Sequence, residues 1–240
     1  MYSTGWNSVP YMPRYRVPKR LKQTAHRAEA LSKARIVRAA IEILDAEGEA
    51  ALTFRGLAAR LATGSGAIYW HIADRNGLLS AATEDVLAPA LVAVGEETDS
   101  KATIRAIALG VFDAIDAHPW AGAHLSREPW HPAIGEIFEH IGGRLQAIGV
   151  PADAQFDCAS ALTSYILGVA CQNAANARLL PRETDRGDFL TAMTARWTQG
   201  DPDSRPFLRQ VAAQLRDHDD RQQFLAGVDL ILLGACVKPA

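Results

Sequence analysis

The segment 52–79, LTFRGLAARLATGSGAIYWHIADRNGLL, constrains the fold of this chain more than any other. Thr53 predicts the N-cap of a short helix over about 54–61, which must end at the Ala-Thr-Gly that follows. Ser65 can cap a second short helix, and Asp74 can cap a third. Two short helices joined by a three- or four-residue turn form a helix-turn-helix, whose second helix can lie in the major groove of DNA.

The residues just before this segment predict one more helix. Leu31-Ser32 provides a hydrophobic staple and a cap, and Gly48 provides the C-terminal stop. Apolar residues recur between them at helical period. Three helices in so short a segment can enclose a small core of Ile36, Ala40, Leu44, Leu57, Leu61, Ile68 and Leu78.

The remainder of the chain also has helical periodicity, so the sequence predicts an all-α protein. Its 240 residues, 48% of them hydrophobic, suffice for one or two domains. Helices are expected over about 74–88, 100–118, 120–125, 132–149, 154–179, 189–197, 207–215 and 221–235. Pro89 should interrupt or kink the first of these. We therefore expect a three-helix helix-turn-helix headpiece at 29–76 and a larger helical domain at 77–240.

Charge is distributed unevenly along the chain. Residues 1–80 carry twelve Lys and Arg against six Asp and Glu, a net charge of +6, and the rest carries −8. This asymmetry is typical of a basic DNA-reading domain on an acidic body. Most of the basic excess lies in residues 1–28, which also contain several prolines and are predicted to be a disordered basic arm. The arm is either an inert tail or a segment that contacts phosphates or the minor groove.

The headpiece resembles the tetracycline-repressor (TetR) family of bacterial transcription regulators. The residues that carry the resemblance are Leu52-Thr53, Arg55, Leu57-Ala58, Ile68-Tyr69-Trp70-His71, Arg75 and Leu78-Leu79. The Tyr-Trp-His triplet and the segment 224–231 are most similar to the tetracycline repressor's own branch. The turn departs from the usual Gly-Val-Ser, and Gly56 within the first motif helix costs about 1 kcal/mol relative to Ala.

The motif and the resemblance together indicate which residues meet DNA. The expected DNA-binding residues are Thr53, Arg55, Ser65, Gly66, Ala67, Tyr69, Trp70 and Arg75. Arg55, Tyr69 and Arg75 are expected mainly on phosphates or nearby base edges. His71 is expected to pack on the first motif helix, whereas Trp70 could face either way.

Two helices of the body need partners. The helix over 154–179 is rich in small residues, and the helix over 221–235 is apolar on more than one face. They are either two core helices or, as the resemblance implies, half of a four-helix interface in a homodimer. A dimer would present two headpieces to a pseudo-palindromic DNA operator.

The body also contains aromatic and polar residues suited to a small-molecule pocket. The candidate effector-binding residues are Phe112, Trp120, His124, Trp130, Phe138, Tyr165, Gln172, Asn173 and Asn176, although each aromatic taken singly favours a place in the core. The tetracycline repressor's branch chelates drug-bound magnesium through a His and a Glu. His124-Leu125-Ser126-Arg127 is similar to the first element, but Gln172 stands at the place of the Glu, and an amide is a poorer ligand for a hard cation.

Other chemistry is not indicated by the sequence. His118, His124, His131 and His140 lack metal-site spacing and are interpreted as solvated or pocket-lining residues. Gly64-Ser65-Gly66 completes no phosphate-binding motif, and no catalytic group is apparent. We therefore expect no metal, no cofactor and no enzymatic activity. Three scattered cysteines, with neither a membrane-length apolar run nor a signal peptide, are typical of a cytoplasmic protein.

These observations favour a homodimeric DNA-binding repressor that leaves its operator when a small organic effector binds the C-terminal domain. We expect this effector to be neutral or weakly polar and of aromatic size. The alternative is a constitutive DNA-binding or protein-interaction module whose dimerisation domain has a filled core. Ligand-dependent thermal stabilisation separates the two.

Overall fold

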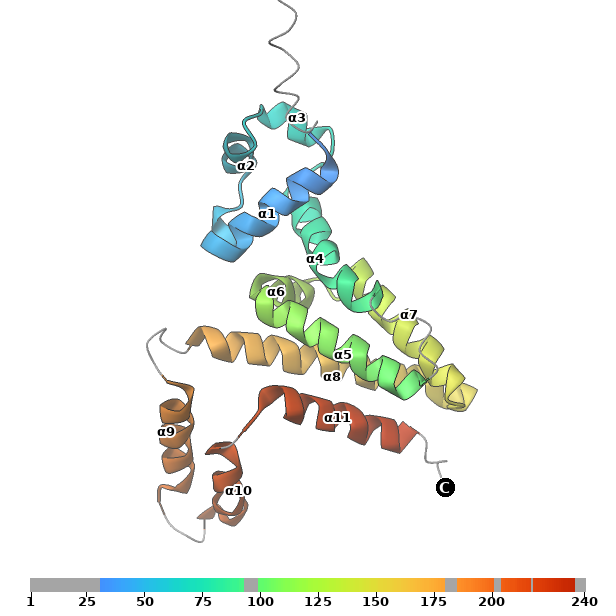
Figure 1. The fold of residues 1–240 in the computed structure, drawn as a ribbon, viewed down its shortest axis with the longest axis vertical. Coiled ribbons are helices and arrows are strands. Elements are labelled where there is room, and N and C mark those ends of the chain that lie inside the picture. The colour runs from blue at the N-terminus through green and yellow to red at the C-terminus, as the bar shows by residue number, and fades with distance from the viewer. Residues whose placement is uncertain (1–30, 93–98, 180–184, 201–203, 217, 236–240) are drawn as a thin grey trace, which may run out of the picture.

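The computed structural model describes residues 31–92, 99–179, 185–200, 204–216 and 218–235. These ranges contain eleven α-helices, one short 3-10 turn and no strand (Figure 1). The elements in chain order are α1 (Lys33–Glu47), η2 (Glu49–Ala51), α2 (Phe54–Arg60), α3 (Ser65–Tyr69), α4 (Arg75–Val92), α5 (Ser100–Ala117), α6 (Pro119–Arg127), α7 (Pro132–Ala147), α8 (Ala152–Leu179), α9 (Arg186–Thr198), α10 (Pro206–Arg216) and α11 (Asp220–Ala235). The all-α prediction is confirmed. The predicted basic arm, 1–28, lies outside the described residues.

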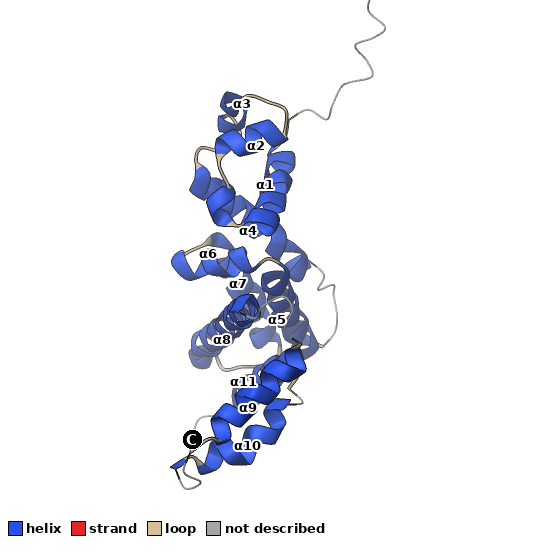
Figure 2. Ribbon diagram, turned by 90° about the vertical axis from the view of Figure 1, so that its left-hand side faces the viewer, coloured by secondary structure: helices blue, strands red, loops and turns tan. Residues whose placement is uncertain are grey.

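The headpiece consists of α1, α2, α3 and the first half of α4, which lie at one end of the molecule (Figure 2). The predicted caps are present: the Ser32 hydroxyl accepts the Arg35 N–H at 3.2 Å, and the Asp74 carboxylate accepts the Gly77 N–H at 2.7 Å. Gly48 ends α1 with φ +80°. The predicted core residues pack together behind these helices, with Leu61 only half-buried. Local capping and one shared core thus fix the headpiece.

The turn between α2 and α3 contains a residue with positive φ, and the residue that caps α3 is not the predicted one. Ala62 adopts φ +51°, the left-handed region that L side chains avoid. The Thr63 N–H donates to the Ala58 carbonyl and the Ala62 N–H to the Ala59 carbonyl, which is a Schellman C-cap normally made with glycine. Gly64, not Ser65, precedes α3 and provides no side-chain cap. This turn is therefore strained by its alanine.

The body is built around a core shared by α4, α5, α7, α8 and α11. Helix α4 continues through Pro89 to Val92, so the expected interruption does not end it. Close packing between α4 and α5 explains why residue 110 of α5 is a glycine. A Cβ on Gly110 would lie 2.8 Å from the Ala90 Cβ, so only glycine lets α4 and α5 approach this closely. Asp99 caps α5, where its carboxylate accepts the Lys101 N–H.

Helix α6 joins the headpiece to the body. Trp120 is only 2% exposed and belongs to the headpiece core, where its indole N–H donates to the Asp45 carboxylate at 2.7 Å. At the other end of α6, the Arg127 guanidinium contacts the Glu49 carboxylate at 2.6 Å. Helix α6, from within the predicted larger domain, is therefore bonded to the headpiece at both of its ends. Residues of α6 complete the headpiece core.

Helices α9 and α10 form a lobe that projects from the body, at the lower left of Figure 1. Leu190, Thr194 and Ala212 are buried between these two helices, and the Thr194 hydroxyl donates to the Ala212 carbonyl at 3.3 Å. The expected helices at 189–197 and 207–215 are confirmed with slightly wider bounds. No helix in the ranges described above is long and apolar enough to cross a membrane.

Candidate DNA-binding face and ligand cavity

Helix α3 presents one face to the headpiece core and the other to solvent. Ile68 is fully buried and anchors the helix, while Ser65 and Gly66 are exposed. The Tyr69 ring stacks on Phe54 of α2, with ring centroids 4.5 Å apart and planes within 9°, yet Tyr69 remains 53% exposed. Ala67 is half-buried, so it contributes little to the outer face.

The residues after Tyr69 also lie at the surface. Trp70 is 90% exposed, and His71 is exposed as well. The prediction that His71 packs on the first motif helix is therefore wrong. The reason is that the core positions of this turn are taken by Ile68 and Ile72, four residues apart on one face.

The two predicted phosphate-binding arginines have different surroundings. Arg55 is exposed on α2 and has no hydrogen-bond or ion-pair partner in the described part of the chain. The Arg75 guanidinium instead donates to the Leu52 carbonyl at 3.0 Å and the Glu49 carbonyl at 2.5 Å, and it contacts the Glu49 carboxylate at 3.4 Å. Arg75 thus braces the loop before α2, which the motif alone did not indicate. Thr53 likewise uses its hydroxyl as a cap, accepting the Gly56 N–H at 3.1 Å.

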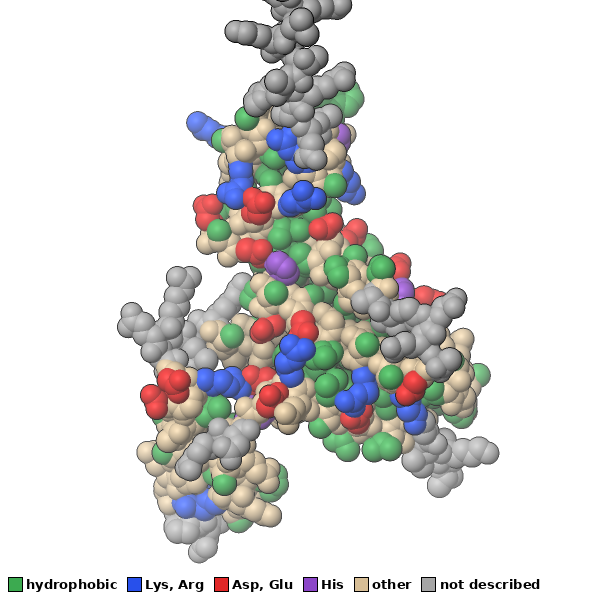
Figure 3. Space-filling model, in the orientation of Figure 1, with side chains coloured by type: hydrophobic (Ala, Val, Ile, Leu, Met, Phe, Trp, Pro, Cys, Tyr) green, Lys and Arg blue, Asp and Glu red, His purple; other side chains and the backbone are tan. Residues whose placement is uncertain are grey.

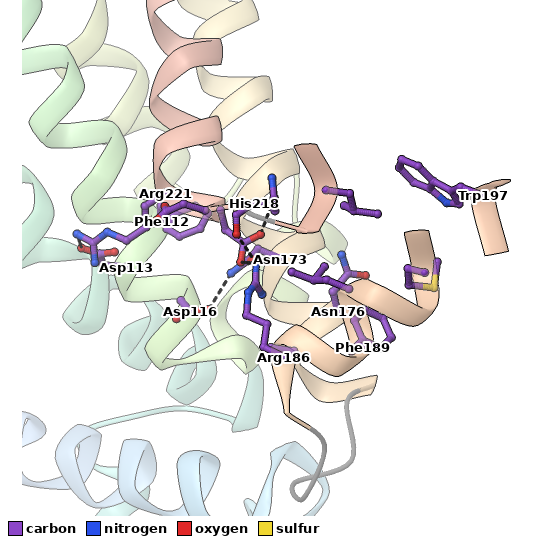
Figure 4. A pocket seen from close by; sticks show the side chains of 16 residues that line it. Phe112, Asp113, Asp116, Asn173, Asn176, Arg186, Phe189, Trp197, His218 and Arg221 are labelled. Carbon is purple, nitrogen blue, oxygen red and sulfur yellow. Dashed lines mark hydrogen bonds and ion pairs between the residues drawn. The ribbon is translucent and has the colours of Figure 1, made fainter. Parts of the chain in front are cut away.

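A cavity of about 660 Å³ lies between the α9–α10 lobe and helices α5, α8 and α11 (Figure 4). Its walls combine an apolar side, mostly from the lobe, with an ionic side. The lining residues are Phe112, Asp113, Asp116, Asn173, Asn176, Ala177, Arg186, Phe189, Leu190, Met193, Trp197, Leu215, His218, Asp219, Asp220 and Arg221. Its size is within the range of small-molecule sites in proteins.

Only part of the predicted effector set lies at this cavity. Phe112, Asn173 and Asn176 line it, and Gln172 lines a smaller adjoining recess of about 190 Å³. Neither space is lined by Trp120, His124, Trp130, Phe138 or Tyr165. Trp120 lies in the headpiece core, and Trp130 is 95% exposed between α6 and α7. Phe138 lies beside the exposed Phe156 at the far end of α8, with ring centroids 5.8 Å apart.

Tyr165 has a packing role. Its hydroxyl donates to the Phe224 carbonyl at 3.1 Å, and its ring stacks on Phe224 with centroids 5.8 Å apart. The ring passes over Gly227 of α11, where an added Cβ would lie 1.9 Å from the hydroxyl oxygen. Burial raises the pKa of the Tyr165 phenol.

The lobe residues of the cavity were not predicted from the sequence. Phe189, Met193 and Trp197 are spaced four residues apart and line one side of the cavity from α9. This spacing was visible in the sequence, but a short polar region around it gave no reason to join it to the body. The charged groups, such as Asp116 and Arg186, come together only through the fold.

The ionic side of the cavity is internally bonded. Arg221 pairs with Asp113 at 3.0 Å, and Arg186 pairs with Asp220 at 2.7 Å. These pairs join α5 to α11 and the lobe to α11. Figure 3 shows acidic and basic side chains gathered where the lobe meets the body. The pairs are half-exposed, so they contribute modestly to stability and mainly place charge around the cavity.

The four histidines consist of one buried pair and two residues that lie apart from it. His124 is 1% exposed and His131 5% exposed, with rings in a T-shaped arrangement 5.3 Å apart, so the interpretation as solvated or pocket-lining residues is wrong for these two. Burial lowers the pKa of both rings. His118 contacts Asp45 at 2.8 Å, whereas His140 is half-buried on α7. The described residues contain no group of three side chains placed to hold a metal ion.

One side of α8 and α11 leaves apolar and small side chains exposed. On α11, Leu230 is 71% exposed and Leu233 63% exposed. The exposed positions of α8 include Ala161, Ser164 and Gly168, whereas Leu162 and Ile166 are buried in the body core. The exposed residues named here are therefore either large and apolar or small, and none of them is charged.

Comparison with known proteins identifies the family. A family model described as "Bacterial regulatory proteins, tetR family" matches residues 36–82. The solved structure of the transcriptional regulator SCO7222, a TetR from Streptomyces coelicolor, is 49% identical, covers 85% of this chain and 97% of its own, and has a TM-score of 0.78. ActR from Streptomyces coelicolor in complex with actinorhodin is 24% identical over 86% of this chain and 96% of its own, with a TM-score of 0.71.

Two curated relatives give the same result. The tetracycline repressor protein class D of Escherichia coli is 26% identical over 210 residues, 85% of this chain and 88% of the relative. An HTH-type transcriptional regulator of Saccharopolyspora erythraea is 28% identical over 139 residues, which span 58% of this chain and 59% of that relative. A helix-turn-helix headpiece on a helical body defines a DNA-binding transcriptional regulator. The chain belongs to the TetR family.

Proposed function

We propose that this protein is a homodimeric repressor that binds a pseudo-palindromic operator and leaves it when a small organic molecule binds the body. The observation that carries the proposal is the exposed face of α3. Ser65, Gly66, Tyr69 and Trp70 are exposed around the buried Ile68. Arg55, which has no side-chain partner among the described residues, lies on the neighbouring α2. Such a face can enter a major groove while an arginine beside it neutralises phosphate.

Dimer formation is supported by the exposed surface of α8 and α11. Leu230 and Leu233 are large apolar residues exposed on α11, and the neighbouring α8 exposes small residues. Two copies related by a two-fold axis would cover both surfaces and form a four-helix interface. A two-fold dimer also gives two α3 helices, as an operator with two half-sites requires.

The effector-responsive alternative is supported by the cavity of about 660 Å³ beside the lobe. The constitutive alternative instead predicts a body whose core is filled and that contains no cavity of this size. In ActR, the same fold was solved with actinorhodin bound. The release mechanism we propose is a population shift: a ligand that binds one arrangement of the body better favours the headpiece spacing of that arrangement.

The DNA-binding part is tested with a duplex that the full-length protein selects from a random pool. Arg55→Ala should weaken binding and lower the salt slope by about one, because one phosphate contact is lost. Tyr69→Ala should weaken binding as well. Lys101→Ala, at an exposed position of α5 far from the headpiece, is the matched control and should bind normally. Unchanged affinity and salt slope in both headpiece variants would contradict the assignment.

The dimer is tested by sedimentation. Leu230→Glu should convert the protein to a monomer, because it places a charge in the proposed interface. The control Val92→Glu alters a residue that is 80% exposed on α4, and it should remain dimeric. A Leu230→Glu protein that sediments as the unmodified one does would disprove this interface.

A further inference from the structure

The cavity beside the lobe contains more negative than positive groups. Its lining includes four carboxylates, two guanidiniums and His218. Both guanidiniums already form ion pairs with aspartates of the lining: Arg221 pairs with Asp113, and Arg186 pairs with Asp220. His218 also contacts the Asp220 carboxylate, at 2.9 Å. The positive charge of the cavity is therefore neutralised by its own walls.

Two carboxylates are left without a cationic partner among the described residues. The Asp219 carboxylate accepts the backbone N–H of Gln222 at 2.8 Å, as a helix cap. The Asp116 carboxylate accepts only the Asn173 side-chain amide at 2.9 Å, and Figure 4 shows this bond within the cavity. The four carboxylates and two guanidiniums of the lining, with His218 not counted, have a summed formal charge of −2. A recess with uncompensated negative charge concentrates cations.

The apolar side of the cavity also favours a cationic ligand, through the attraction between aromatic rings and organic cations. Phe112, Phe189 and Trp197 line it from α5 and α9, and Phe189 remains 38% exposed. The faces of aromatic rings attract organic cations, and the attraction is larger where water is excluded. Leu190 and Met193, between these aromatic residues, offer apolar surface for a hydrophobic scaffold.

We infer that the cavity binds an organic cation, namely an aromatic or hydrophobic scaffold that carries an amine. Asp116 meets the ammonium group, Asn176 is a polar neighbour, and the α9 wall covers the scaffold. This inference rests on the proposed effector function and revises the expectation of a neutral effector. An anionic ligand is disfavoured because each arginine would have to give up its aspartate partner.

The test uses the full-length protein and three probes that share one scaffold. Naphthylmethylamine, naphthylmethanol and naphthoate differ mainly in charge at neutral pH, and their affinities are measured by calorimetry without DNA. We expect the amine to bind about three- to tenfold more tightly than the alcohol, the range of one partly exposed charge pair with additional field from Asp219. Naphthoate should bind most weakly.

Variants assign the effect to residues. Asp116→Asn keeps the shape of the side chain and should at least halve the preference for the amine over the alcohol. Asp157→Asn, an exposed site on α8 outside the cavity, should leave the preference unchanged. Trp197→Leu should lower the affinities for the amine and for the alcohol by a similar factor. Thermal melts of each variant establish that it is folded.

Three results would overturn the inference: no binding of the amine, a preference for the alcohol or naphthoate, or an amine preference that survives Asp116→Asn unchanged. None of these results depends on DNA. If the protein fails to bind any selected duplex, the proposed repressor function fails, while the charge preference of the cavity is still measured. If neutral compounds bind best and release DNA, the repressor function stands and the cation class is wrong.

Discussion

The headpiece and the α9–α10 lobe are fixed in different ways. Headpiece helices share one core that also includes Trp120 of α6. Trp120 and Arg127 of α6 donate hydrogen bonds to the Asp45 and Glu49 carboxylates and so connect this core to α6. The lobe buries Leu190 and Ala212 mainly between its own two helices, and the Arg186–Asp220 pair connects it to α11. A surface that must match DNA is thus held by packing, whereas the cavity wall is held loosely. The cavity that we propose as the ligand site lies in the less constrained region.

The largest expected effect tests whether the body core is as closely packed as the headpiece. Gly227→Ala places a Cβ against the Tyr165 ring and should lower the free energy of unfolding by about 1–3 kcal/mol, the cost of overpacking. Chemical denaturation at fixed protein concentration measures it. Gly143→Ala on α7, where a Cβ meets nothing within 4 Å, is the control and should be neutral or stabilising. Equal stability of both variants would show that Tyr165 moves aside freely.

A pH effect tests the joint between headpiece and body. The pKa values of buried His124 and His131 are lowered below 6.5 by desolvation. The unfolded chain therefore takes up protons first as pH falls through 6.5, and the folded state loses stability until the folded pKa is reached. Each histidine costs up to about 1.4 kcal/mol for every pH unit between its two pKa values. Unfolding free energies from pH 8 to 5 measure this loss.

Variants identify the histidine responsible. The His124 Nε2 atom is buried without a hydrogen-bond partner in the described structure, so His124→Leu should flatten the pH profile. The more accessible His140 serves as control, and His140→Gln should leave the profile as it is. A His124→Leu protein with the original acid sensitivity would refute the assignment.

Substitutions of Arg75 and Arg55 distinguish a residue that stabilises the headpiece from one that binds DNA. Arg75→Ala removes hydrogen bonds to the Leu52 and Glu49 carbonyls and should lower the unfolding free energy by about 1 kcal/mol. Arg55→Ala removes no hydrogen bond or ion pair among the described residues. It should change the unfolding free energy by less than about 0.5 kcal/mol, while weakening DNA binding more than Arg75→Ala does. Thermal melts paired with DNA titrations measure both. The reverse ranking would mean that Arg75 is the phosphate contact.

The smallest expected effect concerns the strained turn. Ala62→Gly relieves a left-handed alanine and should stabilise the protein by at most about 1 kcal/mol, because glycine also gains freedom in the unfolded chain. Denaturation with Ala59→Gly as control, a position inside α2, should show loss instead of gain. A destabilised Ala62→Gly protein would indicate that the alanine is held by contacts rather than strained.

Local signals predicted the helices well because the caps act over a few residues. Ser32, Thr53 and Asp74 cap their helices as the sequence indicates, and Gly48 ends α1. Pro89 was misleading, since tertiary packing keeps α4 helical through it. The DNA-binding set stays a prediction, and the structure gives Arg75 a bracing role that no pattern in the sequence shows.

The cavity could be predicted only in part because its walls come from distant segments. Phe112 and Asn173 were named from composition and position, and both line the cavity. Trp120 and Tyr165 were chosen for their aromatic character, yet they pack in the interior, where large rings bury most area. His124 and Gln172 do not line a common space, so the resemblance to a magnesium-tetracycline site is not accompanied by a shared pocket here.

The most direct test of the account is ligand-driven release of DNA. A fluorescent duplex selected by the full-length protein is titrated with a compound that raises its melting temperature, and anisotropy reports DNA binding. The account predicts that the compound releases DNA from the unmodified protein. It also predicts that Trp197→Leu, altered in the cavity and far from α3, binds the duplex normally but needs much more compound for release. DNA affinity that is unchanged by a bound compound, or equal release from the Trp197→Leu variant, would contradict it.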